Sequence, residues 1–255
     1  YVGVDGTTKI DDAYKYFDVT DAPADVTMPE ALDKDGKVNA TAEFTNPVKV
    51  RAIKVSKTVD LNNTEWNAQD YPEFKFGVTW VDGEGKTQKV ELKLQPTGEG
   101  AKGKAESGQI LVPLDADVIV TETGATVNGQ SVAGWKTEVP AEGSEIVVKS
   151  SNTVQTAAFT NTRETTTING KKIWVGASEE SIKDSIDLFV RRNNETEPLN
   201  EQPINVKLAE NGSFTIPEVN GKNLAMYDEN GNAYTYTLVE APVSGYTTTY
   251  SADTL

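Results

Sequence analysis

The 255-residue sequence contains neither cysteine nor histidine, and each absence removes a class of chemistry. Without cysteine the chain forms no disulfide and offers no thiol nucleophile. Without histidine it lacks the usual general base and the commonest metal ligand, so hydrolysis by a Ser-His-Asp triad and histidine-ligated zinc are both excluded. We therefore predict neither a metal site nor a cofactor.

Basic residues and long apolar runs are also scarce. Only 24 basic residues stand against 39 acidic ones, which gives a net charge of −15. Nucleic acids and anionic membranes attract basic patches, so we expect neither as a partner. No apolar run approaches the length of a membrane span, so we also expect no membrane contact in this segment. The abrupt start at Tyr1 and stop at Leu255 suggest a piece of a longer protein.

The sequence is rich in the alternation typical of β-strands. Apolar residues fall at every second position in residues 74–80, 90–94 and 110–114. This period places one face of each strand in a core. Turn signals separate such segments at Asp82-Gly83, Asn211-Gly212 and Asn230-Gly231. Many short strands joined by tight turns indicate an all-β sandwich or barrel.

Three polar residues occur at strand positions whose neighbours on the same face are apolar. They are Lys57, Glu122 and Asn161, and their neighbours are Ile53, Val55, Val59, Val118, Val120 and Phe159. An isolated charge facing a core costs several kcal/mol unless it is paired or neutralised. We therefore predict that the amine, the acid and the amide meet. The simpler alternative is an ordinary buried salt bridge beside an amide, or edge residues in solvent.

The same three residue types recur in part on either side of this complete set. Asp21 and Asn46 repeat the acid and the asparagine without a matching lysine. Lys172 and Glu240 repeat the lysine and the acid without a matching asparagine. A head-to-tail exchange of strands between the two incomplete ends is one conceivable completion.

These repeats predict three modules along the chain. Residues 1–46 would be the C-terminal part of a preceding β-sandwich module, residues 47–164 a complete module, and residues 165–255 a module lacking its last strand. The joins at Pro47-Val48 and at residues 163–165 are short. Short joins leave little slack, so we expect neighbouring modules to lie end to end as a fairly stiff rod.

Several short motifs resemble a known family. The last module resembles CnaB-type domains of Gram-positive surface adhesins and pilins through residues 170–174, 227–232, 234–240 and Gly245-Tyr246. The middle module is similar through its Lys, Glu and Asn. The resemblance implies tandem immunoglobulin-like β-sandwich modules that form intramolecular isopeptide bonds.

The resemblance also implies a reaction for the three residues. The amine of Lys57 would attack the side-chain carbonyl of Asn161 with loss of ammonia, and Glu122 would promote the step as its catalytic acid. Lys172 and Glu240 would be the matching pair of the last module, and Asp21 and Asn46 partial equivalents in the first. Because the reaction happens once per molecule, the chain would modify itself and would not be an enzyme.

On this interpretation the chain is a structural stalk segment of a Gram-positive surface protein, extracellular and attached to the cell wall. Its partners would be neighbouring modules, and a host protein or glycan bound by other parts of the parent. The sequence contains neither Leu-Pro-x-Thr-Gly nor the pilin motif Tyr-Pro-Lys.

Three alternatives stay open. A pilin subunit is the first. A ligand-binding adhesin module is the second, which exposed aromatic residues such as Tyr71, Trp135 and Tyr250 on one surface would favour. The third is an accessory domain of a carbohydrate-active enzyme, which a pair of carboxylates lining a cleft would favour.

Overall fold

The computed structural model describes residues 50–251, apart from residues 69, 83–84, 99–100, 142, 150, 152, 179–180 and 194. The predicted first module, with Asp21 and Asn46, therefore lies outside the described residues. Every element assigned in the described part is a β-strand, so the prediction of an all-β protein is confirmed.

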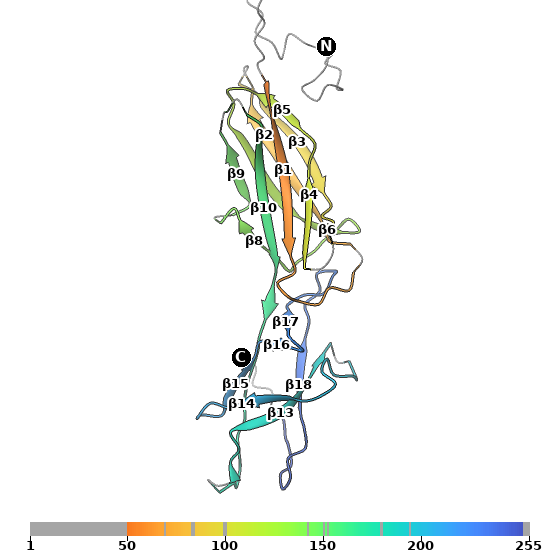
Figure 1. Ribbon diagram of the computed structural model, residues 1–255, viewed down its shortest axis with the longest axis vertical. Helices are drawn as coiled ribbons and strands as arrows, with labels where there is room; N and C mark the ends of the chain where they lie inside the picture. Colours follow the sequence, from red (N-terminus) through yellow and green to blue (C-terminus); the bar gives the residue numbers. More distant parts are fainter. Residues whose placement is uncertain are drawn as a thin grey trace, which may run out of the picture.

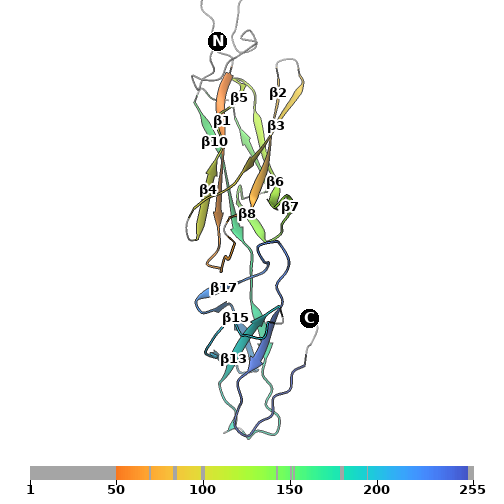
Figure 2. The same ribbon diagram turned by 90° about the vertical axis from the view of Figure 1, so that its right-hand side faces the viewer.

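The first ten strands form two sheets that enclose one core, and we call them the first strand set. One sheet has the order β4 (Lys102–Glu106), β1 (Val50–Asp60), β10 (Gln155–Arg163), β8 (Trp135–Val139), with β5 (Ile110–Pro113) also on β1. The other has the order β3 (Thr87–Leu94), β2 (Glu73–Val81), β6 (Val118–Val127), β7 (Gln130–Ser131), with β9 (Glu145–Val148) also on β6. Figure 2 shows these two layers edge-on.

The first and last strands of this set are neighbours. Strand β1 pairs with β10 in parallel, and Lys57 lies opposite Phe159 while Val59 lies opposite Asn161. Alternate residues of both strands are buried, including Lys57 and Asn161. Glu122 lies on β6 in the other sheet, where it also occupies a buried position. Because successive side chains of a strand alternate between its two faces, all three of these side chains point into the space between the sheets.

The remaining strands form the second strand set. They are β11 (Thr165–Thr166), β12 (Ile168–Lys171), β13 (Ser185–Arg192), β14 (Ile204–Lys207), β15 (Ser213–Ile216), β16 (Glu218–Val219), β17 (Lys222–Ala225) and β18 (Tyr236–Glu240). They pair as β14-β13-β18, β12-β15 and β11-β17-β16.

A second hydrophobic cluster fills this set. Its buried members are Ile186, Leu188, Val190, Val206, Ile216, Val219 and Leu224. The fully buried amide of Asn200 lies beside it, where Oδ1 accepts from the Val190 backbone N–H and Nδ2 donates to the carbonyls of Leu188 and Gln202. Figure 1 shows the two strand sets one beyond the other along the long axis of the molecule.

Candidate functional site

The structure brings Lys57, Glu122 and Asn161 together between the sheets of the first strand set. Lys57 Nζ lies 2.6 Å from Glu122 Oε2, and Asn161 Nδ2 donates to Glu122 Oε1 at 2.6 Å. The Lys57 side chain is fully buried and that of Glu122 is 5% exposed. One buried carboxylate thus holds the amine on one oxygen and the amide on the other.

The walls of this site are aromatic and apolar. Lys57 Nζ lies 4.2 Å from the ring centroid of Phe74, and the rings of Phe76 and Phe159 pack with centroids 5.1 Å apart. Burial among these groups lowers the pKa of Lys57 to about 8, although the Coulombic attraction of Glu122 acts to raise it. Burial disfavours the charged form of the amine, so the neutral form is reached at lower pH than for an exposed lysine.

The amide of Asn161 is only half satisfied. Its Oδ1 is buried and has no hydrogen-bond partner among the described residues. Leaving a buried acceptor without a partner costs about 1–3 kcal/mol. Rotation of the amide exchanges the positions of Oδ1 and Nδ2, and a protonated Glu122 then donates to the carbonyl oxygen.

The second strand set holds the predicted pair Lys172 and Glu240. Lys172 Nζ lies 2.8 Å from the Glu240 carboxylate, whose side chain is 4% exposed. The Thr248 hydroxyl donates to Glu240 Oε2 at 2.7 Å, a contact that the sequence analysis missed. Thr248 follows β18 in a segment without strand structure, so no periodic pattern could have pointed to it. In the described part of the chain, Lys172 and Thr248 are the side chains bonded to this carboxylate.

The exposed aromatic surface that would favour a ligand-binding module is not formed by two of the three residues named for it. Tyr71 is only 7% exposed and stacks on Trp66 with centroids 5.9 Å apart. Trp135 is half-buried and packs edge-on against Trp66 at 5.8 Å and against Phe74 at 5.9 Å. These rings close the core because stacking removes their large apolar faces from water. Only Tyr250 of the three is largely exposed, at 64%.

Two other properties concern the described residues alone. Within them, no group of three or more acidic side chains is arranged to hold a metal ion. The same residues include no helix of the length and hydrophobicity that crossing a membrane requires.

Comparison with known proteins finds a similarity in the C-terminal part of the chain. The family described as "Cna protein B-type domain" matches the sequence over residues 168–255. This match covers 88 of the 255 residues and shows what this region is similar to. This family region contains Lys172, Glu240 and Thr248, and the resemblance drawn from the sequence motifs is confirmed.

Three solved structures match the chain, each with low sequence identity and a TM-score below 0.5. The TIE protein of Bacillus anthracis is 18% identical, with 84% of this chain and 34% of that chain covered and a TM-score of 0.38. The pilus-presented adhesin Spy0125 (Cpa) is 15% identical, with 44% and 27% covered and a TM-score of 0.27. A putative cell adhesion protein from Parabacteroides distasonis is 13% identical, with 55% and 49% covered and a TM-score of 0.25.

The chain thus spans between 27% and 49% of the length of these proteins. No curated protein sequence matches it. The Cna protein B-type family supports a structural, non-enzymatic module of the type found in extracellular surface adhesins and pilins.

Proposed function

We propose that residues 47–164 form a complete module that crosslinks itself through an isopeptide bond between Lys57 and Asn161. The observation that carries this proposal is the buried Glu122 carboxylate, which contacts the Lys57 amine and the Asn161 amide at 2.6 Å each. An ordinary salt bridge has no need of the amide, whereas amide transfer requires all three groups.

The reaction begins with a proton moving from Lys57 Nζ to Glu122, which leaves a neutral amine and a neutral acid. The acid donates to the Asn161 carbonyl oxygen and makes Cγ more electrophilic. Nζ then bonds to Cγ, the Cγ–Nδ2 bond breaks, and Glu122 carries the proton released by Nζ to the departing nitrogen. The products are one secondary amide and one ammonia, so no external reactant is needed.

The fold holds the reacting groups in the orientation that the reaction requires. The parallel register puts the Lys57 and Asn161 positions on neighbouring strands, and Glu122 reaches them from the facing sheet. Holding reactants in a productive orientation can lower a barrier by about 7–11 kcal/mol. The dry aromatic walls add to this, because they lower the pKa of Lys57 and so make the neutral, nucleophilic form of the amine easier to reach.

The direct test is the intact mass of the purified, denatured chain. We expect it to fall below the mass calculated from the sequence by one ammonia. Proteolysis followed by fragment sequencing should recover a branched peptide that joins Lys57 to Asn161. A mass equal to the calculated value, with the Lys57 and Asn161 peptides recovered separately, would contradict the proposal.

The depressed pKa of Lys57 also predicts a pH dependence. In an Asn161→Ala variant Lys57 stays a free amine, with a pKa of about 8 in the fold and 10.5 when unfolded. Between these values the unfolded state binds more protons, so the free energy of unfolding rises with pH. From pH 8 to 10 we expect the variant to gain on the order of 2 kcal/mol relative to the wild type.

Chemical denaturation of both proteins across this pH range measures that difference. In the crosslinked wild type Lys57 Nζ is an amide nitrogen and does not titrate. All other ionisable groups are common to both proteins and cancel in the comparison. Parallel curves for the two proteins would argue against a buried, titrating Lys57.

On a larger scale, we propose that the chain is a stalk segment of a cell-wall-attached Gram-positive adhesin. Residues 1–46, 47–164 and 165–255 would be successive modules lying end to end as a rod. Lys172, promoted by Glu240, would form a second bond with an asparagine beyond Leu255 or one donated by another molecule. Support comes from the family match over residues 168–255 and from the Lys172–Glu240 contact of 2.8 Å. Detection of the protein in the cell-wall fraction of its source cells tests its location.

A further inference from the structure

Arg163 is a buried cation that the crosslinking chemistry does not use. It follows Asn161 by two residues at the end of β10, and its side chain is only 3% exposed. A buried charge is retained only where several groups compensate it. Its surroundings therefore indicate what its position requires.

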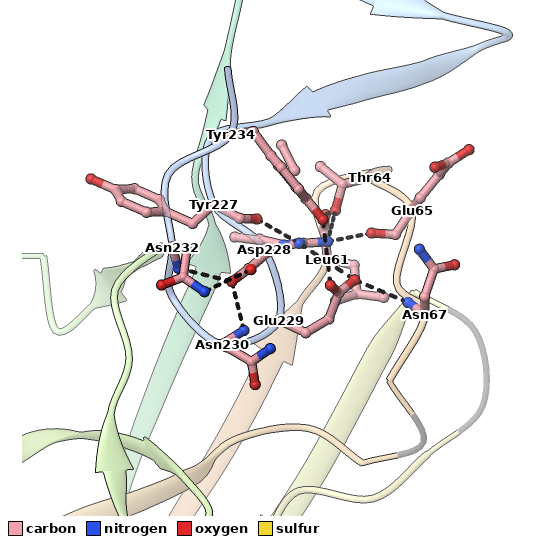
Figure 3. A network of polar contacts seen from close by, with 12 residues as sticks. Leu61, Thr64, Glu65, Asn67, Tyr227, Asp228, Glu229, Asn230, Asn232 and Tyr234 are labelled. Carbon is pink, nitrogen blue, oxygen red and sulfur yellow. Dashed lines mark hydrogen bonds and ion pairs between the residues drawn. The ribbon is translucent and has the colours of Figure 1, made fainter. Parts of the chain in front are cut away.

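The guanidinium of Arg163 connects the two strand sets. Nη1 donates to Thr64 Oγ1 at 3.1 Å and to the carbonyl of Glu65, both in the loop that follows β1. Nη2 donates to the carbonyl of Tyr227 at 2.8 Å and lies 3.8 Å from Glu229 Oε1, both in the second strand set. Figure 3 shows this network, with the loop of residues 61–67 facing the loop of residues 227–234.

The loop of residues 227–234 is itself held in shape. Asp228 Oδ1 accepts from the backbone N–H groups of Asn230 and Asn232, and Asp228 Oδ2 accepts from Asn232 Nδ2. This is the tight turn that the Asn230-Gly231 signal predicts. On its outer side Glu229 Oε1 accepts from the Asn67 backbone N–H at 3.1 Å, which adds a second bond across the boundary.

A separate group of hydrogen bonds joins the strand sets at residues 62–63. The Asn223 backbone N–H donates to the carbonyl of Asn63 at 3.2 Å, and Asn223 Nδ2 donates to the carbonyl of Asn62 at 2.8 Å. In return, Asn63 Nδ2 donates to the carbonyl of Gly221 at 2.8 Å. All three acceptors are backbone carbonyls, which have less freedom to move than side-chain groups.

Two glycines mark a third contact. A Cβ built on Gly231 would lie 2.6 Å from the backbone nitrogen of Ala133, closer than real Cβ atoms approach. A Cβ built on Gly134 would lie 3.1 Å from the side chain of Tyr227. The loop of residues 132–134 and the loop of residues 227–234 therefore touch at a separation that only glycine permits.

The residue that connects the two sets is also fixed. Glu164 lies between β10 and β11, its N–H donates to the carbonyl of Gly134 at 2.9 Å, and its carbonyl accepts from the Met226 N–H at 3.0 Å. The connecting peptide is thus bonded to the first set on one side and to the second set on the other. The peptide at Glu164 cannot act as a hinge while these hydrogen bonds persist.

We propose that residues 61–67, 132–134, 163–164 and 220–234 form a rigid joint that holds the two strand sets in one orientation. Contacts at three separate points define the orientation of one body relative to another. Arg163 is at the centre of the first contact, between the loops of residues 61–67 and 227–234. Relative motion is the usual behaviour of neighbouring domains with small interfaces. Here the joint would make the two sets a single mechanical unit and transmit force directly to β10.

Distance measurements between spin labels test the joint. The chain has no cysteine, so Lys89→Cys and Lys207→Cys place one label on an exposed position of each strand set. We expect one narrow distance distribution in the otherwise wild-type chain. Arg163→Ala should replace it by a broad one, because the joint loses its links to Tyr227 and Glu229. Lys136→Ala, which removes an exposed cation on β8, should leave it narrow.

A glycine pair provides a matched second test. Gly231→Ala introduces the clash with Ala133 at a φ of +82°, whereas Gly245→Ala introduces the same backbone strain at +83° with nothing within 4 Å of the new Cβ. We expect a broad distribution for Gly231→Ala and a narrow one for Gly245→Ala. This pair decides the question if Arg163→Ala does not fold.

Two results would overturn the joint: a broad distribution in the parent chain, or narrow distributions in every folded joint variant. Neither result would bear on the crosslink, which the intact mass reports independently.

Discussion

Lys57→Met is expected to abolish the crosslink, so that the denatured chain has its full calculated mass. Methionine fills nearly the same volume without a nucleophile. The wild-type bond closes a loop of about 100 residues, and loop closure of that size stabilises a fold by about 4–5 kcal/mol. The variant should lose at least that much unfolding free energy, because Glu122 is also left in the core without its cation. Thermal or chemical denaturation measures the loss.

The strand itself provides the control for this substitution. Lys54 lies on the opposite face of β1, where it is half-buried and pairs with Glu106 at 2.6 Å. Exposed pairs of this kind contribute about 0–1 kcal/mol. Lys54→Met should therefore keep the mass deficit of one ammonia and nearly all of the stability. Equal effects of the two substitutions would show that the bond does not involve Lys57.

Glu122→Gln separates the chemistry from the packing. Glutamine keeps the shape of the side chain and a contact with Asn161, but it has no acidic proton to carry between Nζ and Nδ2. We expect both reactants to stay in place and unjoined. Glu91→Gln, at a side chain 76% exposed on β3, is the matched substitution that should not alter the mass.

A mechanical measurement should show the second large effect. When the chain is stretched by its ends, force enters β1 and leaves through β10, which lie side by side in parallel. In the wild type the bond between Lys57 and Asn161 carries the load, and the residues between them stay folded. Without the bond, about 100 further residues extend, which adds roughly 330–360 Å of contour length.

Single-molecule stretching of wild type and Glu122→Gln tests this directly. We expect the additional extension in the variant and its absence in the wild type. The second strand set is unaltered in both, so its own unfolding step is an internal reference. An identical set of extension steps in the two proteins would mean that no covalent bond bypasses the first strand set.

The sequence predicted the strands and the interior of the first set well, because alternation is a local property. In β1 the buried positions include Ile53, Val55, Lys57 and Val59, as their shared face predicted. Glu122 and Asn161 were placed by the same parity argument. The prediction that the three side chains meet needed a second premise, namely that an unpaired charge in a core costs too much free energy to persist.

The sequence did not reveal contacts made outside regular strands. The sequence left open whether Tyr71 and Trp135 are exposed, and the structure shows that they pack around Trp66 because the loop that carries Tyr71 folds back onto the core. Arg163 was named only as part of a short join. Its partners come from two loops with no shared period, so neither pattern nor spacing could connect them.

By itself, the amino-acid sequence determined the all-β character and the inward direction of Lys57, Glu122 and Asn161. Successive side chains of a strand point to opposite faces of the sheet, so the apolar neighbours two positions away show which face each residue shares. Only the tertiary structure decided that β1 and β10 are parallel neighbours, that Glu122 faces them from the other sheet, and that Arg163 links the strand sets. Those features depend on which distant segments pair, and pairing is settled by the burial of whole faces and by the hydrogen bonds of loops.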